Sequence, residues 1–410
     1  MNEGPEVYNS VESMEPLLPA SARGRLAEIT CQILIASGNL VGQIHAPLVR
    51  EKVAGLVRAM NCYYSNLIEG QKTMPRDIER ALKQDFSSDP EKRNNQQLSI
   101  SHIAVESRLA SKLREENVSP YSPEFICWLH EEFYRGLPEA LHWAKTKSGK
   151  RYHVEAGVPR DFMVDVGSHT PPHFAAIPAF LRRFCEGYGS AKIYDTERLV
   201  AVAAAHHRLA WIHPFGDGNG RVVRLHSQAL LIHHGMDGGG LWTLSRGLAR
   251  ARQRYYDLLS NADQKRAGDF DGRGNLSDKA LGEFCQFFLE TMLDQIKYMG
   301  SLLDLPSLRT RIKRYFQFEA LDIVRYKEEL MRIVRVLADE GEIPRARVLE
   351  ITGKSGATVA EIIKHGLARG LFSSPSAKGP LQVAFPEKIL PFYFPQLFID
   401  LPVESRESDA

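Results

Sequence analysis

The sequence is poor in cysteine, has no excess of charge of either sign and contains no long apolar run. Its five cysteines lie far apart and none belongs to a Cys-x-x-Cys pair, so a structural zinc site built from cysteines is not expected. An odd, scattered set of cysteines is typical of a reducing compartment. Since 52 basic residues nearly balance 50 acidic ones, no global field draws the chain toward nucleic acid or acidic lipid.

No segment has the pattern of a membrane span or of a signal peptide. The longest mainly apolar stretch, residues 199–211, is interrupted by His206, His207 and Arg208. It also falls short of the roughly 20 residues that a spanning helix needs. The N-terminus contains acidic residues and lacks an apolar core, unlike a secretory signal. We therefore expect a cytoplasmic protein without membrane contact.

The pattern of apolar residues predicts a mainly helical protein with one small hairpin. Spacings of three and four recur along most of the chain, for instance over residues 51–70, where Gly70 suits a helix end. Residues 145–170 differ, because glycine and proline separate short runs at 152–154 and 162–166, which predicts a hairpin. The chain shows neither an internal repeat nor a low-complexity tract.

A length of 410 residues favours two or three domains. A polar stretch at 87–97 and Pro306 mark the boundaries. We expect an N-terminal helical segment over residues 1–98, a core over 99–305 and a small C-terminal domain over 306–402.

The C-terminal part resembles a winged helix, with two helices joined by a turn and a wing near residues 374–383. Such domains bind DNA through basic helices and wings, although many mediate only protein contacts. Acidic Glu350 and Glu361 interleave with the bases of this part, which favours protein contacts over DNA. The bases are Arg345, Arg347, Lys354, Lys364, Arg369 and Lys378.

Residues 211–224, with the sequence WIHPFGDGNGRVVR, carry the strongest chemical signal. An apolar helical stretch ends near Ile212, a loop with three glycines follows, and an amphipathic stretch begins at Arg221. A glycine-rich loop that opens a helix is an anion site, because unpaired backbone N–H groups and the positive end of the helix dipole face the ligand.

The side chains of this stretch suit phosphate chemistry. Asp217 offers a hard oxygen ligand for Mg²⁺, which prefers carboxylate and phosphate oxygens. Arg221 and Arg224 lie three residues apart on one helix face, where both guanidinium groups can reach phosphates. His213 can accept a proton from an attacking hydroxyl, a role worth roughly 10²–10⁴ in rate. Metal ligand, base and phosphate clamp together indicate nucleotidyl or phosphoryl transfer.

An isolated loop histidine or a lone Gly-x-Gly would mean little, but eight positions agree here with the pattern H-x-F-x-D-G-N-G-R-x-x-R. That pattern resembles the signature of the Fic family, which comprises Mg²⁺-dependent protein AMP transferases. The resemblance extends over roughly residues 55–300. It includes SNLIEG at 65–70, VGSHTPP at 166–172 and RYYDLLSNAD at 254–263.

The resemblance implies a role for each residue of the motif. His213 would deprotonate a Ser, Thr or Tyr hydroxyl of a target protein, and Asp217 would hold Mg²⁺ against the phosphates of ATP. The phosphates would lie in a cradle made by Asn219 with the backbone of Gly218 and Gly220. They would be bound by Arg221 and, at the γ-phosphate, by Arg224.

Two further sites follow from the same resemblance. Tyr256 would pack on the adenine, with Asp263 beside it. Residues 162–169 would form a flap whose exposed edge aligns a segment of the target protein by strand addition.

Residues 65–70 read S-x-x-x-E-G, which in many Fic proteins marks an inhibitory helix. Carried over, Glu69 would pair with Arg224 and exclude the γ-phosphate, since a carboxylate there neutralises the cation and repels the phosphate. The alternative is that Glu69 is a solvated carboxylate at a helix end. That placement is mildly unfavourable with the helix dipole.

Two other patterns are read as ordinary structure. The histidine pairs 206–207 and 233–234 are adjacent, so on a helix their rings point roughly 100° apart, and we expect core or surface histidines rather than metal ligands. Arg246, Arg250 and Arg254 recur every fourth residue, which is typical of a solvated helix face.

The sequence therefore predicts a protein adenylyltransferase that uses ATP and Mg²⁺ and is autoinhibited by Glu69. One alternative is a Fic-like enzyme with different donor chemistry, such as phosphate or phosphocholine transfer. Another is a winged-helix DNA-binding regulator whose Fic core senses nucleotide. A homodimer remains possible.

Overall fold

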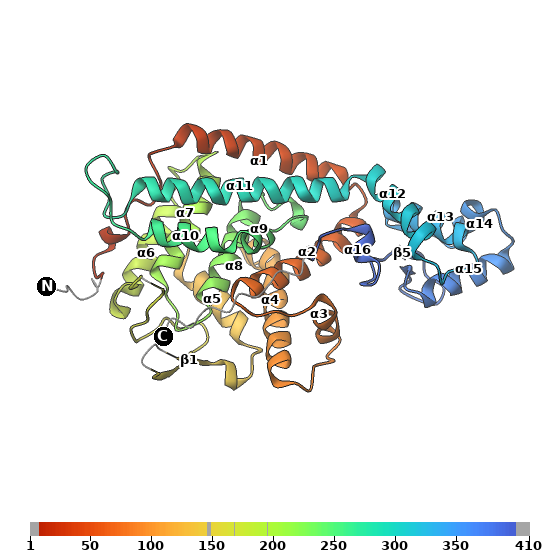
Figure 1. Ribbon diagram of the computed structural model, residues 1–410, viewed down its shortest axis with the longest axis horizontal. Coiled ribbons are helices and arrows are strands. Elements are labelled where there is room, and N and C mark those ends of the chain that lie inside the picture. Colours follow the sequence, from red (N-terminus) through yellow and green to blue (C-terminus); the bar gives the residue numbers. More distant parts are fainter. Residues whose placement is uncertain (1–7, 146–148, 168, 195, 399–410) are drawn as a thin grey trace.

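The computed structural model describes residues 8–145, 149–167, 169–194 and 196–398, and it is mainly helical (Figure 1). The predicted fold class, a helical core with a small antiparallel hairpin, is confirmed. The start of the predicted segment 1–98 and the end of the predicted unit 306–402 lie outside the described residues. The domain boundaries stay predictions.

Local sequence explains where the N-terminal helices begin and end. Proline opens four of the five, at a position where its missing N–H has no helical partner to lose. The side chains of Asp89 and Ser122 accept backbone N–H groups at two of these starts. Gly70, with φ of +82°, follows the second helix as predicted. The five are α1 (Arg23–Gln43), α2 (Pro47–Ile68), α3 (Pro75–Leu82), α4 (Pro90–Arg114) and α5 (Pro123–Tyr134).

The core is built around α7, in which every residue from 201 to 209 is buried. Helices α6, α8 and α11 pack against it, α4 and α5 pack against α8, and α1 lies along α11 (Figure 1). The core helices are α6 (Ile177–Tyr188), α7 (Glu197–Ile212), α8 (Asn219–His233), α9 (Ser245–Arg250), α10 (Arg252–Ala262) and α11 (Asp278–Leu303). Short 3₁₀ turns lie at η1 (Val11–Met14), η2 (Glu139–Leu141), η3 (Phe174–Ala176) and η4 (Gly238–Gly240).

The hairpin lies earlier in the chain than the sequence predicts. Strand β1 (Trp143–Lys145) pairs antiparallel with β2 (Arg151–His153). Residues 162–166 do not pair with β2, and the predicted flap at 162–169 contributes a single bridge between Val166 and His169, with Ser168 outside the described residues. The glycine and proline residues predicted a hairpin in this region. Several short segments of similar composition could serve as strands, however, so the sequence did not determine which of them pairs with β2.

The C-terminal unit, at the blue end of Figure 1, combines helices with a three-stranded sheet. Its strands are antiparallel and lie in the order β3–β5–β4. This order of elements agrees with a winged helix, which stays a prediction for this unit. The elements are α12 (Leu305–Arg314), the π-helical turn η5 (Tyr315–Glu319), α13 (Lys327–Glu340), β3 (Glu342–Ile343), α14 (Arg347–Thr352), α15 (Gly356–Ala368), β4 (Phe372–Ser373), β5 (Leu381–Val383) and α16 (Leu390–Tyr393).

After α16 the chain returns to the core and contacts α2. The hydroxyl of Tyr64 donates to the carbonyl of Leu397 at 3.2 Å, and that of Tyr298 donates to Pro395 at 3.0 Å. Arg246 donates to the carbonyl of Gln396 at 3.1 Å and is fully buried. The solvated helix face predicted for Arg246 is therefore wrong, because a segment distant in sequence covers it.

Among the described residues, no helix combines the length and the apolar character that crossing a membrane requires. The predicted core position of the histidine pair 206–207 is confirmed, since both rings are fully buried and hydrogen-bonded.

Five histidines are fully buried, and the lowered pKa values of four of them make the fold sensitive to mild acid. Burial lowers the pKa of His102 and His130 to about 3, that of His226 to about 4 and that of His206 well below its ordinary value. Each therefore stays neutral in the native state while the unfolded chain takes up a proton below pH ~6.5. Burial raises the pKa of Glu106 to about 7, so the native state itself takes up a proton there as the pH falls. This uptake offsets the destabilising effect of about one of these four histidines.

Because burial lowers the pKa of His207 and His213 in the same direction, we expect the free energy of unfolding to fall by at least roughly 3 kcal/mol between pH 7 and pH 5.5. Each net proton bound on unfolding contributes about 1.4 kcal/mol per pH unit. Urea unfolding followed by tryptophan fluorescence measures it. His226→Gln should reduce the pH dependence by about 1 kcal/mol, whereas His45→Gln, at an exposed position, should leave it unchanged. Equal stability at the two pH values would contradict this assignment.

Candidate active site

The loop between α7 and α8 has a backbone fixed at both ends. His213 ends α7 with a left-handed φ of 49°, and its N–H donates to the carbonyl of Leu209 at 3.2 Å. Gly218 precedes α8 with φ of 76°, a conformation that glycine adopts without strain. Pro214 cannot extend the helix hydrogen bonding. The first N–H groups of α8 therefore open toward the loop, as the sequence predicted for an anion site.

Asn219 shapes the loop from inside. Its Oδ1 accepts from the N–H of Phe215 at 2.9 Å, and its Nδ2 donates to the carbonyl of the same residue at 2.8 Å. The side chain is 3% exposed, so both halves of the amide are occupied. The predicted part of Asn219 in the phosphate cradle stays a prediction. The side chain closes the loop on itself, and the backbone of Gly218 and Gly220 remains for phosphates.

A stack of rings from α5 supports the loop. The ring of Phe215 lies 4.0 Å from that of His130 at an angle of 10°, and His130 lies 4.4 Å from the ring of Tyr134. Nδ1 of His130 accepts from the N–H of Gly157 at 2.9 Å, so Nε2 donates to the carbonyl of Asp217 at 3.2 Å. Burial holds the pKa of His130 at about 3 and keeps this donor pattern fixed.

His213 is placed as a neutral base. Burial lowers its pKa to about 3, with further lowering by Arg160 and His169. The imidazole is therefore unprotonated at neutral pH and can accept a proton. Arg160 fixes this end of the loop, because its guanidinium donates to the carbonyls of His213 at 2.9 Å and Pro172 at 2.7 Å.

Asp217 is the exposed carboxylate of the loop. Its Oδ1 accepts from the N–H of Gly218 at 2.7 Å, which aims the group along the start of α8. The charge of Asp217 also acts on Tyr134. Burial raises the pKa of the Tyr134 hydroxyl, and the nearby Asp217 charge raises it further. One exposed carboxylate beside a helix start suits Mg²⁺, which commonly takes one or two carboxylates together with phosphate oxygens and water.

Both motif arginines are buried and engaged by the end of α2. Nη2 of Arg224 donates to Glu69 Oε1 at 2.8 Å and to the carbonyl of Ser65 at 3.0 Å, while its Nε donates to Ser65 Oγ at 2.8 Å. Nε of Arg221 donates to Asn66 Oδ1 at 3.1 Å, and its Nη2 contacts Gln71 Oε1. The predicted contact between Glu69 and Arg224 is present.

The carboxylate of Glu69 also lies over the first turn of α8. A Cβ atom at Gly220 would collide with Glu69 Oε1 and would come within 3.3 Å of Arg224 Nη1. Glycine at this position therefore leaves room for an anion against the helix start. Glu69 supplies that anion from within the chain.

Tyr256 and Arg252, both in or at the start of α10, hold the last residue of α2. The hydroxyl of Tyr256 and Nε of Arg252 each donate to the carbonyl of Ile68 at 3.0 Å. The predicted packing of Tyr256 on adenine stays a prediction. Asp263 lies 3.1 Å from Nε2 of the buried His207, so its carboxylate is engaged by the core.

Sequence reasoning missed four residues that support the site, namely His130, Tyr134, Arg160 and Gln71. The first two share a face of α5 because they are four residues apart. That spacing was the only signal they gave, and it equally fits a helix that packs in a core.

The part of the chain that contains the loop is similar to a known family. Residues 120–231 match the model of the Fic/DOC family. The chain is 37% identical over 112 residues to Protein adenylyltransferase Fic of Culex quinquefasciatus and 32% identical over 111 residues to that of Aedes aegypti. Each match covers 27% of this chain and 21% of the relative. The chain therefore spans about a fifth of the length of these curated relatives.

Two solved structures share the fold. A Fic family protein from Desulfovibrio desulfuricans G20 has a TM-score of 0.50 at 16% identity, covering 87% of this chain and 96% of that one. Fic-1 (aa134 - 508) from C. elegans has a TM-score of 0.50 at 17% identity, covering 71% of this chain and 76% of that one. At these identities the likeness shows the fold alone.

Replacement of Asn219 tests the closure of the loop. Asn219→Ala leaves the buried N–H and carbonyl of Phe215 unpaired, so the free energy of unfolding should fall by about 2–4 kcal/mol, or 1–2 for each lost hydrogen bond. Asn219→Asp keeps the acceptor for the N–H but places a second carboxylate oxygen against the carbonyl of Phe215, so it should lose at least as much. Urea unfolding of both variants checks the order, and an Asn219→Ala variant as stable as the parent would show that the amide does not close the loop.

Proposed function

We propose, starting from the Fic/DOC-family domain over residues 120–231, that the chain transfers AMP from ATP to a Ser, Thr or Tyr hydroxyl of another protein. The proposal further holds that Glu69 restrains this reaction. The observation that carries it is the loop itself, which ends α7 at a neutral His213 and opens α8 beside the exposed carboxylate of Asp217. Relatives matched over this region are named protein adenylyltransferases.

The chemistry requires a base and an anion site at one place. The target hydroxyl oxygen attacks the α-phosphorus, the bond from that phosphorus to the oxygen bridging the β-phosphate breaks, and pyrophosphate leaves. His213 takes the proton of the hydroxyl. The start of α8 and the two arginines stabilise the negative charge of the phosphates. Asp217 would hold Mg²⁺, which would neutralise part of that charge.

The restraint follows from the position of Glu69. Its carboxylate occupies Arg224 and the space over Gly220. A phosphate bound at the same place has to displace it, and repulsion between the two anions disfavours joint occupancy. With Arg224 engaged, ATP binds with its phosphates turned away from the loop, and the α-phosphate is poorly placed for attack.

The contacts of the C-terminal unit favour a protein partner over DNA. Lys354 lies 3.1 Å from Glu329, Arg347 donates to Glu340 at 2.8 Å and Arg345 donates to the carbonyl of Gly379 at 2.8 Å. Bases engaged in this way offer less charge to a phosphate backbone. The target protein would align along the segment 162–169, where Val166 pairs with His169.

Removal of the restraint is the direct test of the proposal. Glu69→Gly frees Arg224 and the space over Gly220, so self-labelling of the purified protein by ATP radiolabelled at the α-phosphate should rise about ten-fold or more. A lost pair of ~1.4 kcal/mol already gives that factor. Labelling is measured by autoradiography, with ATP labelled at the γ-phosphate as the control for phosphate transfer.

The double variant Glu69→Gly with His213→Ala should be silent, since the base is absent. If Glu69→Gly labels no faster than the parent, Glu69 is not a restraint. If the double variant keeps the gain, His213 is not the base. Label from the γ-phosphate would assign the chain to phosphate transfer instead.

Asp217→Ala distinguishes a metal ligand from a nucleotide contact. In the Glu69→Gly background it should weaken binding of Mg²⁺-ATP far more than binding of ATP in the presence of a chelator, because the carboxylate would touch only the ion. Calorimetric titration gives both affinities. Equal losses in the two titrations would assign Asp217 to the nucleotide.

A further inference from the structure

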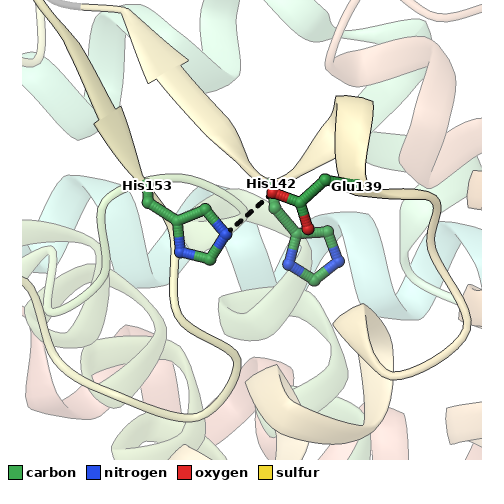
Figure 2. Close-up of side chains that lie close together, drawn as sticks. All are labelled: Glu139, His142 and His153. Carbon is green, nitrogen blue, oxygen red and sulfur yellow. Dashed lines mark hydrogen bonds and ion pairs between the residues drawn. The ribbon is translucent and has the colours of Figure 1, made fainter.

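Three metal-ligating side chains meet at the base of the hairpin, outside the catalytic loop. Figure 2 shows Glu139 from η2, His142 just after it and His153 at the end of β2 directed toward one another. One ligand atom from each can be chosen such that all three lie within 4.8 Å of one another. His153 Nε2 and Glu139 Oε1 are already 3.2 Å apart.

Backbone hydrogen bonds fix the positions of these residues. The N–H of His142 donates to the carbonyl of Glu139 at 3.0 Å, and the N–H of Val154 donates to the carbonyl of His142 at 2.7 Å. His153 lies opposite Trp143 in the register of the two strands. The three side chains therefore start from a held framework, and only side-chain torsions separate them from a closer arrangement.

Neighbouring aromatic rings orient both imidazoles. Tyr134 lies edge-on to His142 at 5.2 Å, and Trp143 lies edge-on to His153 at 5.1 Å. The imidazoles are 5.9 Å apart with an angle of 22° between their planes. Over the described part of the chain, no hydrogen bond is found to the ring nitrogens of His142, so its lone pair is open to a ligand.

From this geometry we propose that Glu139, His142 and His153 bind a divalent transition metal ion, with Zn²⁺ as the preferred ion. Two imidazoles and one carboxylate are a known zinc ligand set that leaves the fourth position for water. Tetrahedral ligands at zinc bond lengths lie roughly 3.3 Å apart, so side-chain movements of up to about 1.5 Å close the site. Mg²⁺ prefers oxygen ligands and does not compete well here.

An ion at this place would fasten the hairpin beside the catalytic loop. His142 touches Tyr134. A Cβ at Gly218 would come within 2.9 Å of the same tyrosine ring. The ion would thus link η2 to β2, next to the Tyr134 side chain that contacts the loop. A plain ion pair between Glu139 and His153 accounts for two of the three residues and does not involve a nitrogen of His142.

The experiment uses the untagged full chain without nucleotide, so its outcome is independent of the proposed transfer reaction. Calorimetric titration with Zn²⁺, and visible absorption after addition of Co²⁺, should give one ion per chain and the spectrum of a tetrahedral site. His142→Ala and His153→Ala should each weaken binding by at least about 100-fold, since even supporting residues of metal sites cost 10–100-fold. His45→Ala removes an exposed histidine elsewhere and should bind as the parent does.

Thermal unfolding in the presence of a chelator checks that all variants are folded. Failure of the parent to take up either ion overturns the proposal. So does unchanged binding in both His142→Ala and His153→Ala, or an equal loss in His45→Ala, which would indicate non-specific uptake.

Discussion

The guanidinium of Arg224 is almost wholly removed from water, and the arrangement of the site depends on how its charge is met. Its side chain is 3% exposed, and its three hydrogen bonds end on Ser65 and Glu69 at the end of α2. A buried cation without a partner is strongly unfavourable. Although burial alone would lower the pKa of Arg224, Glu69 and the neighbouring tyrosines raise it, so the charge is kept. The end of α2 therefore takes the place of an anion.

Helix α2 can hold this position because other parts of the chain secure it. Tyr256 and Arg252 bind its last carbonyl, and the C-terminal segment accepts a hydrogen bond from Tyr64, one residue before Ser65. The loop between α7 and α8 is secured separately, by the Asn219 amide and by the rings of His130 and Tyr134. The loop and the end of α2 are thus held by separate sets of contacts.

The sequence predicted those parts of the site whose residues lie close together along the chain. His213, Asp217, Gly218 and Arg224 act through a loop and one helix turn, so their relation follows from local geometry. The contact of Glu69 with Arg224 spans 155 residues, and only the family resemblance brought the two together. Helical periodicity and turn residues also gave most of the fold.

The features of the site and the fold that the sequence did not predict depend on tertiary packing. His130 reaches Asp217 across 87 residues, and its place on α5 looks like that of any core histidine. Arg246 follows an exposed pattern but is covered by the segment around Gln396. The Asn219 amide turned inward because the N–H and carbonyl of Phe215, buried in the loop, need partners. The hairpin paired with 143–145 rather than 162–166, since short strands define register weakly.

If Glu69 occupies the place of a phosphate at Arg224, its charge must weaken nucleotide binding, which affinity measurements can detect. Calorimetry on the parent and on Glu69→Gln, which keeps the shape and removes the charge, compares ATP with AMP. The account predicts that the substitution tightens ATP binding by about ten-fold, the effect of ~1.4 kcal/mol. It also predicts almost no change for AMP, which has no γ-phosphate to meet Arg224. Equal effects on the two nucleotides, or none on ATP, would contradict it.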